Sequence, residues 1–304
     1  MAKGISLHFG LNAVDPAAYQ GWSGPLNACE ADARDMQALA QSVGYESQLL
    51  LTERATRAAL TTGIADAAAR LASGDIFLLT ISSHGGQLPD LSGDEDDSLD
   101  ETWCLFDGQV IDDEVSLALT ALAEGVRVVV VSDSCHSGTM VRTHAARAIY
   151  GDMLSRQAAV AASAIAEDGT VRSTAEIFSA LAADVPAALP RVMPAEISSR
   201  IYFGDKPAFD ARSANPELKD VAARVKASVI LLSGCQDNQL SMDGPFNGAF
   251  TARLKTVWNG GGFSGGYDAF VSRIVAGMEP TQTPGIFRIG KREPAFDADR
   301  PFTI

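Results

Sequence analysis

The chain of 304 residues is long enough for one large domain or two modest ones. Hydrophobic residues make up 46% of it and charged residues 20%, which indicates a globular protein with an ample core and argues against disorder. The formal net charge of -14 argues against nucleic acid as a partner, because phosphate binding needs a basic surface.

The cysteines and the apolar runs bear on the cellular compartment. The four cysteines lack the C-x-x-C spacing of metal sites, so we expect free thiols in a reducing compartment. The N-terminal residues lack the continuous apolar segment of a signal peptide, and no later run approaches the length of a membrane span. We therefore expect a cytoplasmic protein with no membrane partner.

Apolar runs alternate with helical patterns along the chain. We expect strands at 4–14, 47–51, 75–81, 128–131, 229–233 and 285–289. We expect helices at 26–43, 56–71, 112–122, 143–165, 174–183, 246–258 and 269–278. This alternation predicts an α/β fold with a mostly parallel central sheet. No repeat or linker interrupts the chain, so residues 1–304 are expected to form one domain.

The strand at 128–131 leads into the most reactive stretch of the chain. Its four consecutive valines predict a strand buried on both faces. It is followed by Asp133, Ser134 and Cys135, and in open α/β sheets ligands bind just beyond such strand ends. Cys135 is therefore placed for chemistry, although a buried structural thiol is the alternative.

A histidine follows another buried strand and completes a candidate dyad. His84 comes after the strand at 75–81, and a neighbouring imidazole can turn a thiol such as Cys135 into the nucleophilic thiolate. The backbone N–H groups of Gly85 and Cys135 could form an oxyanion hole. His136 is the rival base, but adjacent side chains on an extended loop tend to point apart.

Five short motifs together resemble the metacaspases, including the bacterial orthocaspases, within the caspase-like cysteine peptidases. They lie at 82–87, 94–101, 112–113, 133–138 and 233–239. The resemblance implies a caspase-like three-layer α/β/α sandwich. It also implies a large-subunit-like part at 1–141, an inserted or linker segment at 142–226 and a small-subunit-like part at 227–304.

The resemblance implies an endopeptidase that cuts through an acyl-enzyme formed on the cysteine. Asp133 matches one acid of the family's primary specificity pocket, and Asp32 matches a second through a C-x-x-D pattern that begins at Cys29. Ser82 matches a further pocket position. Two carboxylates would hold a guanidinium, so we expect peptide or protein substrates with Arg or Lys before the cut. Alternatively, Asp32 is only a first-turn helix acid.

The resemblance also suggests calcium as a cofactor. Asp100, Asp112 and Asp113 match calcium ligands of many metacaspases, but Arg142 stands where the family has a fourth aspartate. A cation there removes a ligand and repels the ion, so we expect no required cofactor. The alternative is a calcium site, and a third interpretation is an acidic solvated loop with helix-capping aspartates.

Self-processing and oligomeric state are further expectations from the resemblance. Six arginines between 141 and 224 are candidate self-cleavage sites, and the sequence does not distinguish them: Arg142, Arg147, Arg156, Arg172, Arg191 and Arg200. A monomer is expected. The alternatives to a peptidase are a catalytically silent caspase-like scaffold and a calcium-responsive binding module.

Overall fold

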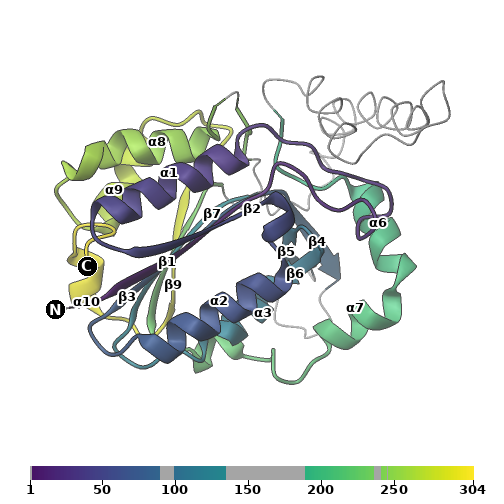
Figure 1. The fold of residues 1–304 in the computed structure, drawn as a ribbon, viewed down its shortest axis with the longest axis horizontal. Helices are drawn as coiled ribbons and strands as arrows, with labels where there is room; N and C mark the ends of the chain where they lie inside the picture. The colour runs from purple at the N-terminus through teal and green to yellow at the C-terminus, as the bar shows by residue number, and fades with distance from the viewer. Residues whose placement is uncertain (1, 90–98, 135–188, 236–240, 245) are drawn as a thin grey trace.

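The structure is a computed structural model that describes residues 2–89, 99–134, 189–235, 241–244 and 246–304 (Figure 1). Its centre is a six-stranded sheet in the order β2-β1-β3-β7-β8-β9. The strands are β1 (Gly4–Gly10), β2 (Glu46–Leu51), β3 (Ile76–Ser82), β7 (Arg127–Asp133), β8 (Ser228–Ser233) and β9 (Gly285–Gly290). All neighbouring pairs are parallel except β8 with β9, so the sheet is the mostly parallel one that the sequence predicts.

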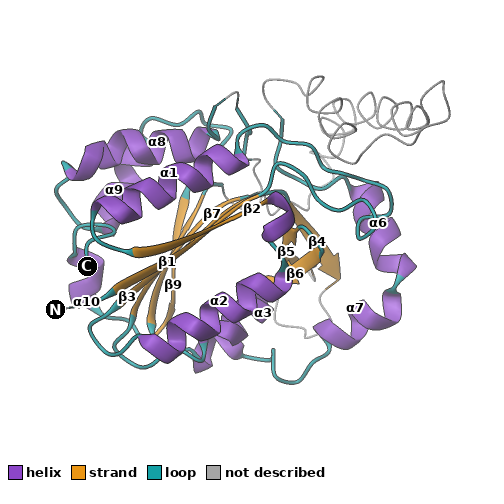
Figure 2. Cartoon of the chain, viewed as in Figure 1, coloured by secondary structure: helices purple, strands orange, loops and turns teal. Residues whose placement is uncertain are grey.

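Helices cover both faces of this sheet (Figure 2). One face carries α1 (Cys29–Ser42), α8 (Ala249–Trp258) and α9 (Tyr267–Val275), and the other carries α2 (Arg57–Arg70) and α3 (Asp112–Leu119). Each face has its own hydrophobic core. The short helix α10 (Pro294–Ala298) adds Phe296 to the first core. The result is a three-layer α/β/α sandwich.

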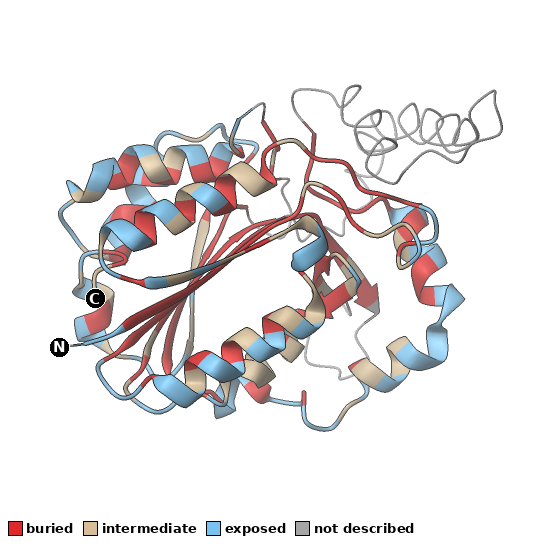
Figure 3. Cartoon of the chain, in the orientation of Figure 1, coloured by how far each residue is buried: buried red, intermediate tan, exposed pale blue. Residues whose placement is uncertain are grey.

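The valine run explains why β7 lies in the middle of the sheet. Val128 and Val130 contribute to the core beneath α2 and α3, whereas Val129 and Val131 contribute to the core beneath α1 and α8. Successive side chains of a strand point to opposite faces, so a strand covered on both sides must be apolar throughout. Figure 3 shows the same burial along the neighbouring central strands.

A second, smaller sheet was not predicted. It is antiparallel, in the order β4-β5-β6, with β4 (Gly85–Pro89), β5 (Leu99–Leu105) and β6 (Gly108–Ile111). None of these three strands was among those expected from the sequence. The helices α6 (Ala195–Gly204) and α7 (Lys206–Ser213) were also missed, and α6 packs near β4, where Ser198 Oγ donates to the Gln87 carbonyl at 2.8 Å.

The predicted elements of the main sheet exist, with shifted ends. The first strand ends at Gly10 rather than at residue 14, and the following helix begins at Cys29 rather than at 26. The helix predicted at 112–122 ends at Leu119, and the one predicted at 269–278 ends at Val275. The helices expected at 143–165 and 174–183 lie outside the described residues. Short 3-10 helices occur at η1 (Thr52–Arg54), η2 (Val221–Arg224) and η3 (Asn259–Gly261).

Among the described residues, no helix combines the length and the apolar composition that crossing a bilayer requires. The three cysteines that the structure describes are free thiols and buried: Cys29, Cys104 and Cys235.

Candidate active site and specificity pocket

The two reactive stretches lie at the same edge of the sheet. β3 and β7 are adjacent and parallel, and Ser82 is in register with Asp133. His84 therefore follows one strand end while Ser134 follows the next. Cys135 lies outside the described residues, and the chain reaches it directly from the buried Ser134. The topology thus brings the predicted base and the residue before the predicted nucleophile to one edge.

His84 is buried with its two ring nitrogens in different settings. Nε2 lies 3.1 Å from the Gly24 carbonyl oxygen, and since a carbonyl can only accept, Nε2 must carry the proton. Nδ1 is buried and has no hydrogen-bond partner among the described residues. The Trp22 ring packs against the imidazole with centroids 4.8 Å apart. Nδ1 is thus the nitrogen left to accept a proton.

The environment of His84 favours the neutral imidazole. Burial lowers the pKa of His84 to about 3, and the nearby positive charge of Arg191 acts in the same direction. The hydrogen bond to the Gly24 carbonyl opposes this shift but is outweighed. At neutral pH the ring is therefore uncharged.

A chain of side-chain hydrogen bonds links the small sheet to the residues just before Cys135. Trp103 on β5 donates from Nε1 to Ser132 Oγ at 3.1 Å, and Ser132 Oγ lies 2.8 Å from Ser134 Oγ. All three residues are buried. The small sheet thereby braces the end of β7, the strand that leads to the predicted nucleophile.

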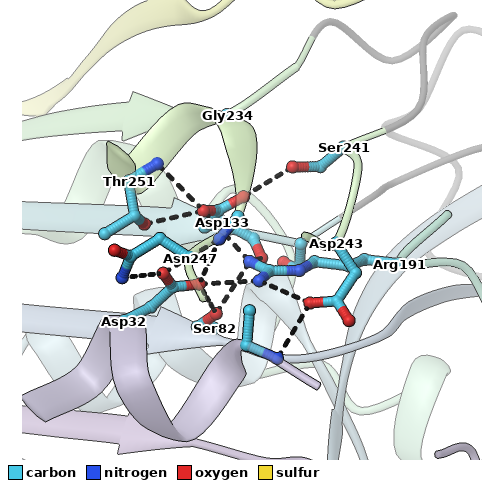
Figure 4. Close-up of polar contacts among 12 residues, drawn as sticks. Asp32, Ser82, Asp133, Arg191, Gly234, Ser241, Asp243, Asn247 and Thr251 are labelled. Atoms are coloured by element: carbon cyan, nitrogen blue, oxygen red, sulfur yellow. Dashed lines mark hydrogen bonds and ion pairs between the residues drawn. The ribbon is translucent and has the colours of Figure 1, made fainter. Parts of the chain in front are cut away.

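The predicted pocket residues converge, and an arginine of the same chain occupies the space between them (Figure 4). The Arg191 side chain is fully buried. Its Nη2 lies 2.6 Å from Asp32 Oδ2, and its Nη1 lies 3.0 Å from Asp133 Oδ2. Nη1 also donates to Ser82 Oγ at 2.8 Å. The acids that were predicted to hold a guanidinium therefore hold one here.

A third acid, which the sequence analysis missed, completes the pocket. Asp243 Oδ1 lies 3.0 Å from Arg191 Nη2, and the Asp243 side chain is fully buried. It comes from the loop between β8 and α8 and also accepts from the backbone N–H groups of Asn27 and Ala28. These bonds tie the loop to the start of α1, and they fix the direction in which the carboxylate points.

The other two carboxylates are held in place by donors that surround the pocket. Asp32 Oδ1 accepts from Asn247 Nδ2 at 2.9 Å and from the Gly248 N–H at 3.0 Å. Asp133 accepts from Ser241 Oγ at 2.5 Å and from Thr251 Oγ1 at 2.7 Å. A buried carboxylate is tolerated only when its oxygens are paired in this way.

Charge and burial oppose one another in this cluster. Burial raises the pKa of the Asp32 carboxyl, which the charge of Arg191 counteracts. The acids raise the pKa of the Arg191 guanidinium well above its ordinary value despite its burial, so it stays charged. Burial also raises the pKa of the Cys29 thiol, which outweighs the opposing effect of Arg191. Cys29 is thus a neutral side chain beside the pocket.

Gly248 forms the wall against which the guanidinium lies. A Cβ built on Gly248 would lie 2.6 Å from both terminal nitrogens of Arg191. Its φ of -60° and ψ of 150° are open to any residue, so the backbone does not require glycine there. The pocket requires it, because a side chain would occupy the space of the guanidinium.

The predicted calcium ligands do not gather into a metal site in the described part of the chain. No group of three or more His, Cys, Asp or Glu side chains there could hold an ion. Asp112 and Asp113 lie in the first turn of α3, and Asp100 on β5 accepts from Ser213 Oγ at 2.5 Å. Arg142 lies outside the described residues. Calcium binding by these residues stays a prediction, and the reaction proposed below involves no metal ion.

The sheet and the position of the pocket define a three-layer α/β protein whose candidate site lies beyond the carboxyl ends of β3 and β7. Residues 13–300 match the caspase domain family, Peptidase C14. Because the match covers nearly the whole chain, the protein belongs to this family of caspase-like cysteine peptidases.

Curated relatives agree with this assignment, and a solved structure shares the fold. Metacaspase-1 of Cryptococcus neoformans is 35% identical over 136 residues, which are 40% of this chain and 30% of that protein. Metacaspase-1 of Emericella nidulans is also 35% identical over 136 residues, which are 34% of its length. These alignments span about a third of each relative. Protein GSU0716 from Geobacter sulfurreducens has a crystal structure with a TM-score of 0.79 and 44% identity, covering 99% of this chain and 98% of that one.

Proposed function

We propose that the protein is a cysteine endopeptidase that hydrolyses the peptide bond after an arginine or a lysine. The observation that carries the proposal is the pocket that binds the Arg191 side chain. There three buried carboxylates and Ser82 Oγ surround one guanidinium. An aspartate side chain in the same place would be repelled and left without donors. The pocket therefore favours a cation in the residue before the cut.

In the proposed reaction, the Cys135 thiolate attacks the carbonyl carbon of that residue. His84 accepts the thiol proton at Nδ1, the nitrogen without a partner among the described residues, and returns it to the leaving amine. The Gly85 N–H donates to the oxygen that becomes negatively charged. Water then hydrolyses the thioester and releases the carboxylate product.

Arginine should be the better substrate of the two cations. Arg191 Nη2 donates to Asp32 and Asp243, and Nη1 donates to Ser82 Oγ and the Asp133 carbonyl oxygen. The two terminal nitrogens of the guanidinium therefore use different acceptors. A lysine ammonium is a single point charge and cannot reproduce this fork.

Peptides with a fluorogenic leaving group after Arg, Lys or Asp test the proposal. The wild type should cleave the Arg peptide fastest and the Asp peptide not at all, and Cys135→Ala should cleave none. A chelator arm in the same assay tests metal dependence, and we expect unchanged rates. Cleavage that survives Cys135→Ala, or that occurs only after Asp, contradicts the proposal.

A catalytically silent scaffold is the competing function, because the pocket is filled by the chain itself. It predicts no Cys135-dependent cleavage of any of the three peptides, so the same assay distinguishes the two.

A further inference from the structure

We infer that the bond between Arg191 and Val192 is the chain's own cleavage site, and that residues 189–193 block the pocket until it is cut. The inference rests on the proposed function and adds a regulation of the same site. It starts from the way in which the main chain on both sides of Arg191 is bound.

Residues 189–191 lie along the pocket as a bound peptide would. The Arg191 N–H donates to the Ser241 carbonyl at 2.9 Å, and the Asp243 N–H donates to the Leu189 carbonyl at 2.7 Å. Pro190 forms an antiparallel bridge with Met242. Such strand-like main-chain pairing holds a peptide regardless of its sequence, while the side-chain pocket selects the residue.

The carbonyl of Arg191 meets the donor proposed for the oxyanion. The Gly85 N–H donates to the Arg191 carbonyl oxygen at 2.9 Å, and the Met193 N–H donates to the Gly85 carbonyl at 2.8 Å. The bond between Arg191 and Val192 therefore sits between two hydrogen bonds to Gly85, directly after His84. A bond to be cut needs this combination of a filled specificity pocket and a polarised carbonyl.

Arg200 shows what an unsuitable arginine looks like. It is exposed on the helix α6, where its peptide bond belongs to a helical turn and cannot pair as an extended strand. Arg191 and Arg200 are the two of the six candidate arginines that the structure describes. Arg200 thus supplies a matched control for Arg191.

The cleavage is an ordinary hydrolysis. The Cys135 sulfur bonds to the Arg191 carbonyl carbon, the bond to the Val192 nitrogen breaks, and the amine leaves with the proton from His84. Water then splits the thioester, which regenerates the thiol and leaves a carboxylate on Arg191. The products are chains 1–191 and 192–304.

Before the cut, the segment competes with every external substrate. The Arg191 side chain is fully buried, so another arginine cannot reach Asp32 or Asp243 until it leaves. A tethered ligand acts at an effective concentration in the millimolar range. A peptide supplied at about 0.1 mM should therefore be cut roughly tenfold more slowly by the uncut chain than by the cut one.

Intact mass and N-terminal sequencing of four proteins test the cleavage site. Wild type and Arg200→Gln should convert to chains that end at Arg191 and begin at Val192. Cys135→Ala and Arg191→Gln should not form these chains. A wild type that cleaves Arg peptides while its own bond after Arg191 stays intact would overturn the inference and leave the proposed function standing. Loss of peptide cleavage altogether would refute both.

Val192→Pro tests the block without removing the buried cation, whose loss could unfold Arg191→Gln. Proline after the cut makes a poor scissile bond, and it favours an extended conformation for Arg191, which the bound segment already has. The variant should stay uncut, melt like Cys135→Ala and cleave Arg peptides roughly tenfold more slowly than cut wild type. Equal rates would show that residues 189–193 do not block the pocket.

Discussion

Asp243 offers the sharpest substitution in the pocket, because its Oδ1 accepts from Arg191 Nη2 at 3.0 Å. Asp243→Asn keeps the size of the side chain but removes its negative charge. Its NH2 group also replaces one of the carboxylate oxygens that accept hydrogen bonds. Losing one charged hydrogen bond costs about 1.5–3 kcal/mol, so kcat/KM for Arg peptides should fall about 10–100-fold. Asp268→Asn, an exposed acid paired with Arg288, is the control and should leave kcat/KM unchanged. Similar losses in both variants would contradict the role of Asp243.

Gly248→Ala tests the pocket wall. Its Cβ would stand 2.6 Å from the guanidinium, but the backbone there tolerates alanine, so the fold should persist while Arg binding weakens. In the chain already cut after Arg191, we expect KM for Arg peptides to rise at least about tenfold, a loss of about 1.4 kcal/mol of binding. The uncut variant should melt lower than the uncut wild type, because the new Cβ meets the buried Arg191 side chain. Gly204→Ala on α6 provides the matched control. An unchanged KM in Gly248→Ala would mean that substrates do not enter as Arg191 does.

The individual pocket residues differ in how far the sequence could predict them. Asp32, Asp133 and Ser82 were predicted, because each belongs to a motif that resembles the metacaspases. Asp243 carries no local signal: it is one acid in a loop, and only the tertiary fold brings it beside α1. Arg191 was one of six equivalent candidates, and its burial among carboxylates is invisible to composition or spacing.

At the scale of elements, the central strands were predictable and the small sheet was not. The centre of β7, residues 128–131, is entirely valine because both of its faces are covered. β4 contains two glycines and a proline, and β6 has only four residues, so neither shows a strand pattern. β4 matters for the site because the N–H and the carbonyl of Gly85 both form hydrogen bonds with the segment around Arg191. Main-chain groups form these bonds, so no side-chain pattern in the sequence predicts them.

The helix α6 did leave a signal in the sequence. Ile197, Ile201 and Tyr202 are its buried residues, at the i, i+4 and i+5 spacing of an amphipathic helix. Pro194 precedes its first residue, where proline is compatible with a helix start. Pro186, Pro190 and Pro194 stand just upstream of this spacing, so no helix was expected there from the sequence.

For the whole molecule, two buried neutral histidines should make stability fall on acidification. Burial lowers the pKa of both His8 and His84 to about 3, whereas an unfolded histidine titrates near 6.5. Between these values the unfolded chain binds more protons, so the free energy of unfolding decreases as pH falls. Each histidine should lower the free energy of unfolding by about 2 kcal/mol between pH 6.5 and pH 5.

Denaturant unfolding at pH 7 and pH 5 checks this dependence. His8 is the residue to substitute, because it lies away from the pocket and bonds to Thr80 and Ser6. His8→Gln should lose about 2 kcal/mol less than wild type between the two pH values. The raised pKa of Asp32 acts in the opposite direction in both proteins, so it cancels in the comparison. Equal losses would mean that His8 does not titrate as its burial implies.

The central claim is that one acidic pocket delivers a cation-bearing residue to Cys135. Two peptides with the same reactive carbonyl warhead, one ending in Arg and one in Asp, test it by intact mass and peptide mapping. With the chain already cut after Arg191, the Arg peptide should add once per molecule, at Cys135, and the Asp peptide should not add. Equal labelling by both peptides, or an adduct on Cys29, Cys104 or Cys235 instead, would contradict it.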